Sequence, residues 1–233
     1  MRRTCLIFGC FACLAVAASR AATGQSAGSA SSSASAVAPD TPRSIDGVAA
    51  RIEDDILTES EVRELAAFQR LIDGQAKPRA DLIRELGDQW VVRGEADAAK
   101  YGPPSQDDIE RAFSQLVARF PSQEEFRNRC AAVELTEAEI RRILAQQIYL
   151  SRFLDYRFRP AAQVDQKQIE AYYDDEFTPQ LKSRGQPVPP LDDVEDTIRE
   201  VLVQRAISER AAQWLDETRL RLKIDVISQG DHP

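Results

Sequence analysis

The sequence is poor in the side chains that most enzyme active sites use. Its 233 residues include one histidine, His232, which stands next to the C-terminal residue. A mechanism that needs a positioned imidazole, or a histidine-rich metal site, would have to use this tail, residues 229–233, which we expect to be frayed. The sequence has no GxGxxG, GxxxxGK[ST] or HExxH motif. We therefore predict no catalytic residue, no cofactor and no metal site.

The first 22 residues have the pattern of a secretory signal peptide. Arg2 and Arg3 give a positive start, an apolar run of about 15 residues follows, and small residues precede residue 22. A membrane anchor is the alternative, but this run is shorter than the roughly 20 apolar residues of a spanning helix, and no second apolar run follows. We predict export to the periplasm and no integral membrane segment after cleavage.

Removal of this segment changes the cysteine content and the charge. Cys5, Cys10 and Cys13 leave with it, and Cys130 becomes the one cysteine of the mature chain. An exported domain without disulfides must be held by its hydrophobic core, and we interpret Cys130 as part of that core. The formal net charge of −8 becomes −11, because three arginines and no acid are lost. Such a surface repels nucleic acid and anionic membranes.

The mature chain begins with a linker and continues as one domain. Residues 23–44 are rich in Ser, Ala and Gly and hold two prolines. A segment with so little to bury cannot offset its ordering entropy, and we expect it to be disordered. Regular patterning runs from residue 45 to about residue 228, which we take as a single domain.

The domain pattern predicts a mostly α-helical fold with a small cluster of strands. Short strands are expected at 45–52 and 56–57, and a strictly alternating strand at 223–227. Capping residues place helix starts near 58, 79, 105, 122 and 136, with the boxes of Thr58, Ser122 and Thr136 the clearest and those of Ser105 and Asp165 weaker. A short helix at 165–177, a loop at 178–190 and a long helix at 191–222 follow. We expect the last strand to pair with the first ones and the long helix to pack on the N-terminal helices.

Aromatic residues are the best candidates for a binding surface. Thirteen of them, Tyr101 and Trp214 included, could line a cleft for unfolded segments, and those on clear apolar stripes are interpreted as core. Five lie near helix ends or off the stripes and are the peptide-binding candidates, with core or rim packing as the alternative role: Tyr149, Tyr156, Phe158, Tyr172 and Tyr173.

The order of these segments resembles the chaperone core of the SurA-type periplasmic chaperones. The similarity covers about residues 45–228. It is carried by the opening segment 47–62, the helix of Ile109 and Phe113, the segment 141–147, the Tyr172-Tyr173 helix and the closing stretch from Leu191 to Ile227. No single motif is diagnostic, and the ordered set carries the resemblance. It implies binding of unfolded exported proteins.

The chain departs from that family at one place. SurA-like foldases insert one or two parvulin isomerase domains of roughly a hundred residues between the Tyr-Tyr helix and the C-terminal helix, whereas this chain has the thirteen residues 178–190 there. Because a parvulin pocket holds two histidines and the core of this chain has none, the resemblance implies a chaperone-like module without isomerase activity. A residual prolyl isomerase and a non-catalytic scaffold or adaptor subunit are the alternatives.

Overall fold

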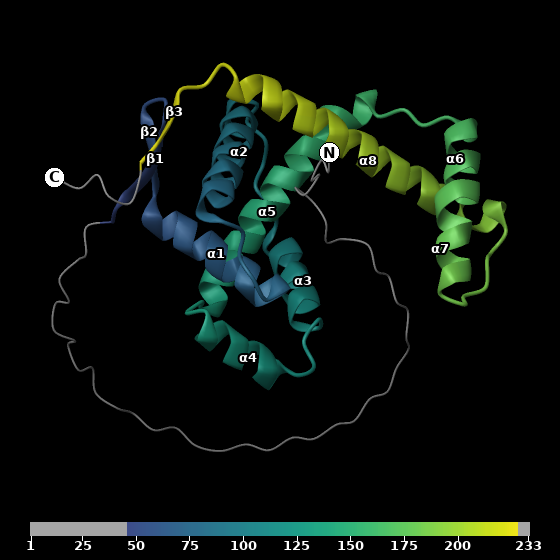
Figure 1. The fold of residues 1–233 in the computed structure, drawn as a ribbon, viewed down its shortest axis with the longest axis horizontal. Coiled ribbons are helices and arrows are strands. Elements are labelled where there is room, and N and C mark those ends of the chain that lie inside the picture. The colour runs from purple at the N-terminus through teal and green to yellow at the C-terminus, as the bar shows by residue number, and fades with distance from the viewer. Residues whose placement is uncertain (1–45, 228–233) are drawn as a thin grey trace. The chain divides into compact units, whose positions relative to one another are not determined.

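The computed structural model describes residues 46–227, and the predicted signal peptide, linker and tail lie outside this range. The described part is mostly helical with one small sheet (Figure 1), which confirms the predicted fold class. The strands are β1 (Val48–Ile52), β2 (Asp55–Thr58) and β3 (Ile224–Val226). The helices are α1 (Glu59–Asp73), α2 (Arg79–Ala98), α3 (Gln106–Val117), α4 (Gln123–Ala132), α5 (Glu137–Phe158), the 3-10 turn η1 (Arg159–Ala161), α6 (Gln166–Tyr172), the π-helical turn η2 (Tyr173–Phe177), α7 (Thr178–Ser183) and α8 (Leu191–Arg219).

The sheet joins the two ends of the described chain. Its strand order is β2-β1-β3, and both pairs are antiparallel. Arg51 of β1 stands opposite Ile56 of β2 and Asp225 of β3. Glu53, with a φ of 51°, lies in the turn after β1 and donates its backbone N–H to the carbonyl of Lys223 at 3.0 Å. The prediction that the last strand pairs with the first ones is confirmed.

Five of the helices begin at the predicted capping residues, whereas α2 and α8 begin directly after Pro78 and Pro190 without a side-chain cap. In a complete capping box the first residue accepts a hydrogen bond from the backbone of the fourth, whose side chain accepts one in return. Ser122 makes the first of these bonds, accepting from the N–H of Glu125 at 3.1 Å. Complete boxes form at four other pairs, among them the two predicted to be weaker: Thr58–Glu61, Ser105–Asp108, Thr136–Glu139 and Asp165–Gln168.

The hydrophobic core consists of three clusters, and α5 contributes to two of them. The first, around Phe126 and Ile140, joins α1, α3, α4 and the start of α5. The second, around Ile52, lies between the sheet, α1 and α2. The third, around Phe153 and Leu215, joins α2, the end of α5 and α8. Helix α5 therefore connects the two halves of the helical body.

Cys130 is a free cysteine buried in the first of these clusters. Burial raises the pKa of its thiol, which disfavours the reactive thiolate. Its interpretation as a core residue is confirmed.

The long helix α8 packs back on α2 and α5, as predicted, and also contacts α6. The apolar spacing of this helix also predicts Val194, Val201 and Leu202 on its buried side, but these three side chains are only half-buried. They lie in the first half of the helix, the part that runs to α6 (Figure 1). The buried residues of α8 are Ile198, Ile207, Ala211 and Leu215.

The region after the Tyr-Tyr helix differs from the prediction. Residues 178–183 form helix α7 rather than loop, and only residues 184–190 lack regular helix. The four prolines and one glycine of residues 178–190 predict a loop, because a proline has no N–H to donate and its ring crowds the carbonyl four residues before it. Just before Pro179, the N–H of Thr178 bonds to the carbonyl of Tyr173, five residues back. This π-helical turn lets the helix continue through Pro179.

An ion pair fixes the C-terminal end of α8 against α2. Arg219 donates to the two carboxylate oxygens of Asp88 at 2.6 and 3.1 Å, and to exposed Asp216 at 2.6 Å. Asp88 is only 7% exposed. Burial raises the pKa of its carboxyl in spite of the two bonds from Arg219. The pair therefore serves to position α8, since much of its attraction offsets the cost of burying the carboxylate.

This pair predicts unequal effects of removing its members. Arg219→Ala should lower the free energy of unfolding by about 2–3 kcal/mol, because it leaves Asp88 buried without its partner. The loss should be larger at pH 7 than at pH 4, because a buried carboxyl with a raised pKa destabilises the folded state only when ionised. Urea unfolding at the two pH values measures both effects.

Two further variants serve as controls. Asp216→Ala removes only the exposed partner and should change the free energy of unfolding by less than about 0.5 kcal/mol. The double variant Asp88→Ala, Arg219→Ala should be more stable than Arg219→Ala alone, because no unpaired carboxylate remains. A double variant less stable than the single one would contradict the role assigned to Asp88.

Candidate functional site

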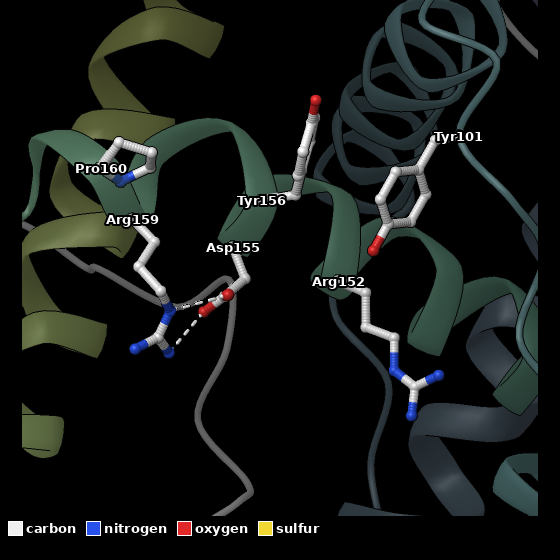
Figure 2. A pocket seen from close by; sticks show the side chains of 6 residues that line it. All are labelled: Tyr101, Arg152, Asp155, Tyr156, Arg159 and Pro160. Atoms are coloured by element: carbon white, nitrogen blue, oxygen red, sulfur yellow. Dashed lines mark hydrogen bonds and ion pairs between the residues drawn. The ribbon is translucent and has the colours of Figure 1, made fainter.

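An open depression lies where the end of α5 faces the connection between α2 and α3. Its volume is about 450 Å³. Figure 2 shows its lining side chains, all but one of which come from the end of α5 and from η1: Tyr101, Arg152, Asp155, Tyr156, Arg159 and Pro160. A volume in the hundreds of Å³ is in the range of small ligand sites.

Tyr101 is the centre of an aromatic cluster on one side of the depression. Its ring centroid lies 5.9 Å from that of Tyr149, 5.7 Å from that of Phe153 and 5.5 Å from that of Tyr156. Phe153 is fully buried in the third core cluster, whereas Tyr156 is 64% exposed. The cluster therefore extends from the core to the surface, and Tyr156 is its outermost ring.

Tyr149 anchors this cluster to the end of α2 through its hydroxyl. Its hydroxyl donates to Asp97 at 2.8 Å and lies 3.3 Å from the backbone carbonyl of Tyr101. Partial burial, together with the hydrogen bond to Asp97, raises the pKa of Tyr149. The hydroxyl therefore stays protonated and continues to tie α5 to the end of α2.

Arg152 ties the depression to the start of α3. It donates to Asp108 at 2.7 Å, and the same carboxylate accepts from the hydroxyl of Ser105 at 2.7 Å and from Arg111 at 2.8 Å. The bonds from Arg152 and Ser105 hold the pKa of Asp108 far below its usual value. Arg152 is therefore paired with a permanently ionised carboxylate.

Arg159 joins α5 to α8 on the other side of the depression. Its guanidinium donates two bonds to Asp155, both of 2.8 Å, and two to Glu200, of 3.0 and 2.7 Å. Gln204 also donates to both carboxylates. The bonds from Arg159 lower the pKa of Asp155 and of Glu200, and the same pairing raises the pKa of Arg159. All three groups therefore carry fixed charges.

These contacts determine what the depression can do chemically. Both of its arginines and its one carboxylate are paired within the protein, and what remains open is tyrosine ring surface and Pro160. Within residues 46–227, no group of three or more His, Cys, Asp or Glu side chains could hold a metal ion. The same residues include no helix that is long and apolar enough to cross a membrane. The arrangement suits the binding of an uncharged, partly apolar group.

The five predicted binding residues lie in separate places. Tyr149 and Tyr156 meet at Tyr101, but only Tyr156 lines the depression. Phe158 packs against Trp214 in the third core cluster, with ring centroids 5.8 Å apart. Of the three aromatic residues that the apolar stripes predict to be core, Phe113 is buried, whereas Phe120 and Trp214 are half-buried.

The remaining two predicted residues lie on α6 and η2. The hydroxyl of Tyr173 donates to the carbonyl of Pro189 at 2.7 Å, and its ring stacks on Phe177 at 5.9 Å. The Tyr172 ring lies 5.0 Å from the guanidinium of Arg205. Both tyrosines are thus engaged in contacts that hold α6, η2 and α8 together.

Local sequence patterns do not single out most of the residues that line the depression. Tyr101 was one of thirteen candidate aromatics, with no signal that placed it at the centre. The spacing of Asp155 and Arg159, four residues apart on a helix, predicts that they pair. Their meeting with Glu200 depends on how α8 crosses α5, which local spacing does not show.

No model of a known protein family matches this chain, and no curated protein matches it either.

The Arg159 network yields a prediction about stability in acid. Arg159→Gln should lower the free energy of unfolding at pH 7 by about 1 kcal/mol, because these ion pairs are partly exposed. Carboxyls with lowered pKa stabilise the folded state above their unfolded pKa and stop doing so as pH falls. The difference between variant and wild type should therefore shrink between pH 7 and pH 2.5, as measured by chemical unfolding.

Arg129→Gln is the matched control, since it removes one arginine and one exposed pair with Glu125 on α4. We expect it to change the free energy of unfolding by less than about 0.5 kcal/mol. If Arg159→Gln had no larger effect than this control, the network would not join α5 to α8 energetically.

Proposed function

We propose that the protein is a periplasmic, ATP-independent, chaperone-like protein that binds unfolded exported proteins without catalysing a reaction on them. The observation that carries the proposal is the tyrosine surface formed by half-buried Tyr101 and exposed Tyr156, beside which the charged groups are paired. A rigid aromatic surface offers contact area at low entropic cost, and it binds many sequences because it demands no particular charge.

The arrangement of the chain supports this proposal. The pairing of β3 with β1 and the return of α8 over α2 and α5 fit the domain organisation that the resemblance to SurA-type chaperones implies. Where foldases of that type insert isomerase domains, this chain has helix α7 and the short segment 184–190. Binding without isomerase activity is consistent with this domain arrangement and with the short connection between the Tyr172-Tyr173 helix and α8.

The proposal predicts that the mature protein suppresses aggregation. Light scattering of an unfolded outer-membrane-type protein, diluted from denaturant, should fall when the mature chain is present at stoichiometric excess. Tyr156→Ala should weaken this suppression, because it removes the most exposed ring of the site.

The control for this experiment is Leu220→Ala, which removes an apolar side chain that is 88% exposed and does not line the depression. It should suppress aggregation as well as the wild type does. Absence of suppression by the wild-type protein at excess would overturn the proposed function, and an equal loss in both variants would overturn the assignment of the site.

A proline-limited peptide assay tests the non-enzymatic part of the proposal. In the presence of the mature protein, prolyl isomerisation should be as slow as the uncatalysed reaction, which takes roughly tens to hundreds of seconds at 25 °C. Turnover above that rate would favour a residual isomerase.

A scaffold or adaptor subunit is the second candidate, and one observation favours it. Among residues 46–227 only four large apolar side chains are strongly exposed, and three of them lie away from the depression: Ile56, Leu220 and Val226. A client-binding surface is normally larger and more continuous. Photo-crosslinking from position 156 separates the two, since a chaperone labels an added unfolded protein whereas a scaffold does not.

A further inference from the structure

We propose that the Tyr101–Tyr156 depression binds a proline-containing segment in the extended polyproline II conformation. The inference rests on the proposed function and specifies which part of an unfolded chain the site selects. It is carried by three features of the site, namely the fixed rings, two hydroxyls without partners, and the absence of unpaired charge.

The rings are held in place before any ligand binds. Tyr101 packs on Phe153, which is 1% exposed, and Tyr149 is anchored through Asp97. Tyr156 then extends from this base, with its centroid 5.5 Å from that of Tyr101 and the two planes tilted by 39°. Two tilted rings of this kind leave a surface onto which a flat pyrrolidine ring can pack, as in other aromatic grooves that recognise proline.

The two outer hydroxyls are available as donors. Within residues 46–227, neither the Tyr101 hydroxyl nor the Tyr156 hydroxyl has a hydrogen-bond partner in the protein, in contrast to those of Tyr149 and Tyr173. Figure 2 shows the two hydroxyls at opposite ends of the ring pair. They can therefore donate to two different carbonyls of one ligand.

This arrangement favours the polyproline II conformation over the alternatives. An α-helix uses its carbonyls in internal hydrogen bonds, and a β-strand needs a neighbouring row of backbone groups. A polyproline II segment has no internal hydrogen bonds, so its carbonyls can accept from tyrosine hydroxyls. Because proline also fixes its own φ, such a segment loses less conformational entropy on binding.

The charges of the site are complementary to an uncharged ligand. Arg152 is engaged by Asp108, and Arg159 makes four bonds to Asp155 and Glu200. An anionic or cationic ligand would have to break one of these pairs to gain a partner of its own. A neutral segment of alternating Ala and Pro meets no such cost.

The test is fluorescence polarisation with a labelled Ala-Pro peptide of about ten residues, which forms polyproline II turns of three residues each. A peptide of equal length made of Ala, Gly and Ser is the reference. We expect the Ala-Pro peptide to bind with a Kd below about 1 mM and at least 10-fold more tightly than the reference. Binding should change little between about 50 and 500 mM salt, because no ion pair is formed.

Variants of the site separate the ring from the hydroxyl. Tyr156→Ala should weaken binding about 10-fold or more, and Tyr156→Phe, which keeps the ring, about 2- to 10-fold. Leu220→Ala, a change away from the depression, should leave the Kd unchanged. Tyr156 is well exposed, so its substitution should preserve the fold, which circular dichroism checks.

Each outcome decides the proposal. Equal affinity for both peptides, a Kd unaffected by Tyr156→Ala, or no binding up to about 1 mM would overturn it. The proposed chaperone function is measured separately, as suppression of aggregation of an unfolded protein. Suppression without proline selectivity would overturn only the present inference, whereas proline binding without suppression would overturn only the chaperone function.

Discussion

The pairing of β3 with β1 is the contact on which the positions of the other elements depend. It brings the end of the domain back to its beginning, so that α8 must start far from the sheet and run toward it. At 29 residues, α8 is about 43 Å long. A strand of three residues is a weak anchor alone. It is reinforced by the hydrogen bond from the backbone N–H of Lys223 to the side chain of Glu53 at 2.7 Å, and by the Arg219–Asp88 pair at the end of α8.

Because its C-terminal end is fixed at the sheet, α8 contacts different elements along its length. Its second half completes the third core cluster with α2 and α5, and its middle brings Glu200 to Arg159 at the end of α5. Its first half carries α6, η2 and α7, where Ile169 is the one fully buried side chain. The bidentate pair of Arg205 with Glu176 adds to this contact. With so little buried apolar surface, this part of the chain should open at a lower free energy than the body does.

The sequence predicts the elements of this fold well where the signal is local. The start of a helix at Thr58, Ser105 or Thr136 depends on a hydroxyl and on an acid three residues later, both within one turn of the chain, and these starts hold. The prediction of a loop is wrong at residues 178–183 for a local reason that the proline content of the segment does not indicate. A proline within a regular α-helix crowds the carbonyl four residues before it. The π-helical turn before Pro179 bonds to the carbonyl five residues back instead, and the helix continues.

The site is harder to predict because it depends on contacts between distant segments. Tyr101 is separated by about fifty residues from the rings it touches, and Glu200 by 41 residues from Arg159. In the assembled fold, the pairing of five charged groups in and beside the depression favours their ionised forms: the pKa values of Asp108, Asp155 and Glu200 are lowered, and those of Arg152 and Arg159 are raised. General acid–base catalysis needs a group that titrates near the working pH. Permanent charges of this kind are consistent with the binding surface proposed above, in which the hydroxyls of Tyr101 and Tyr156 are the polar groups that a ligand would meet.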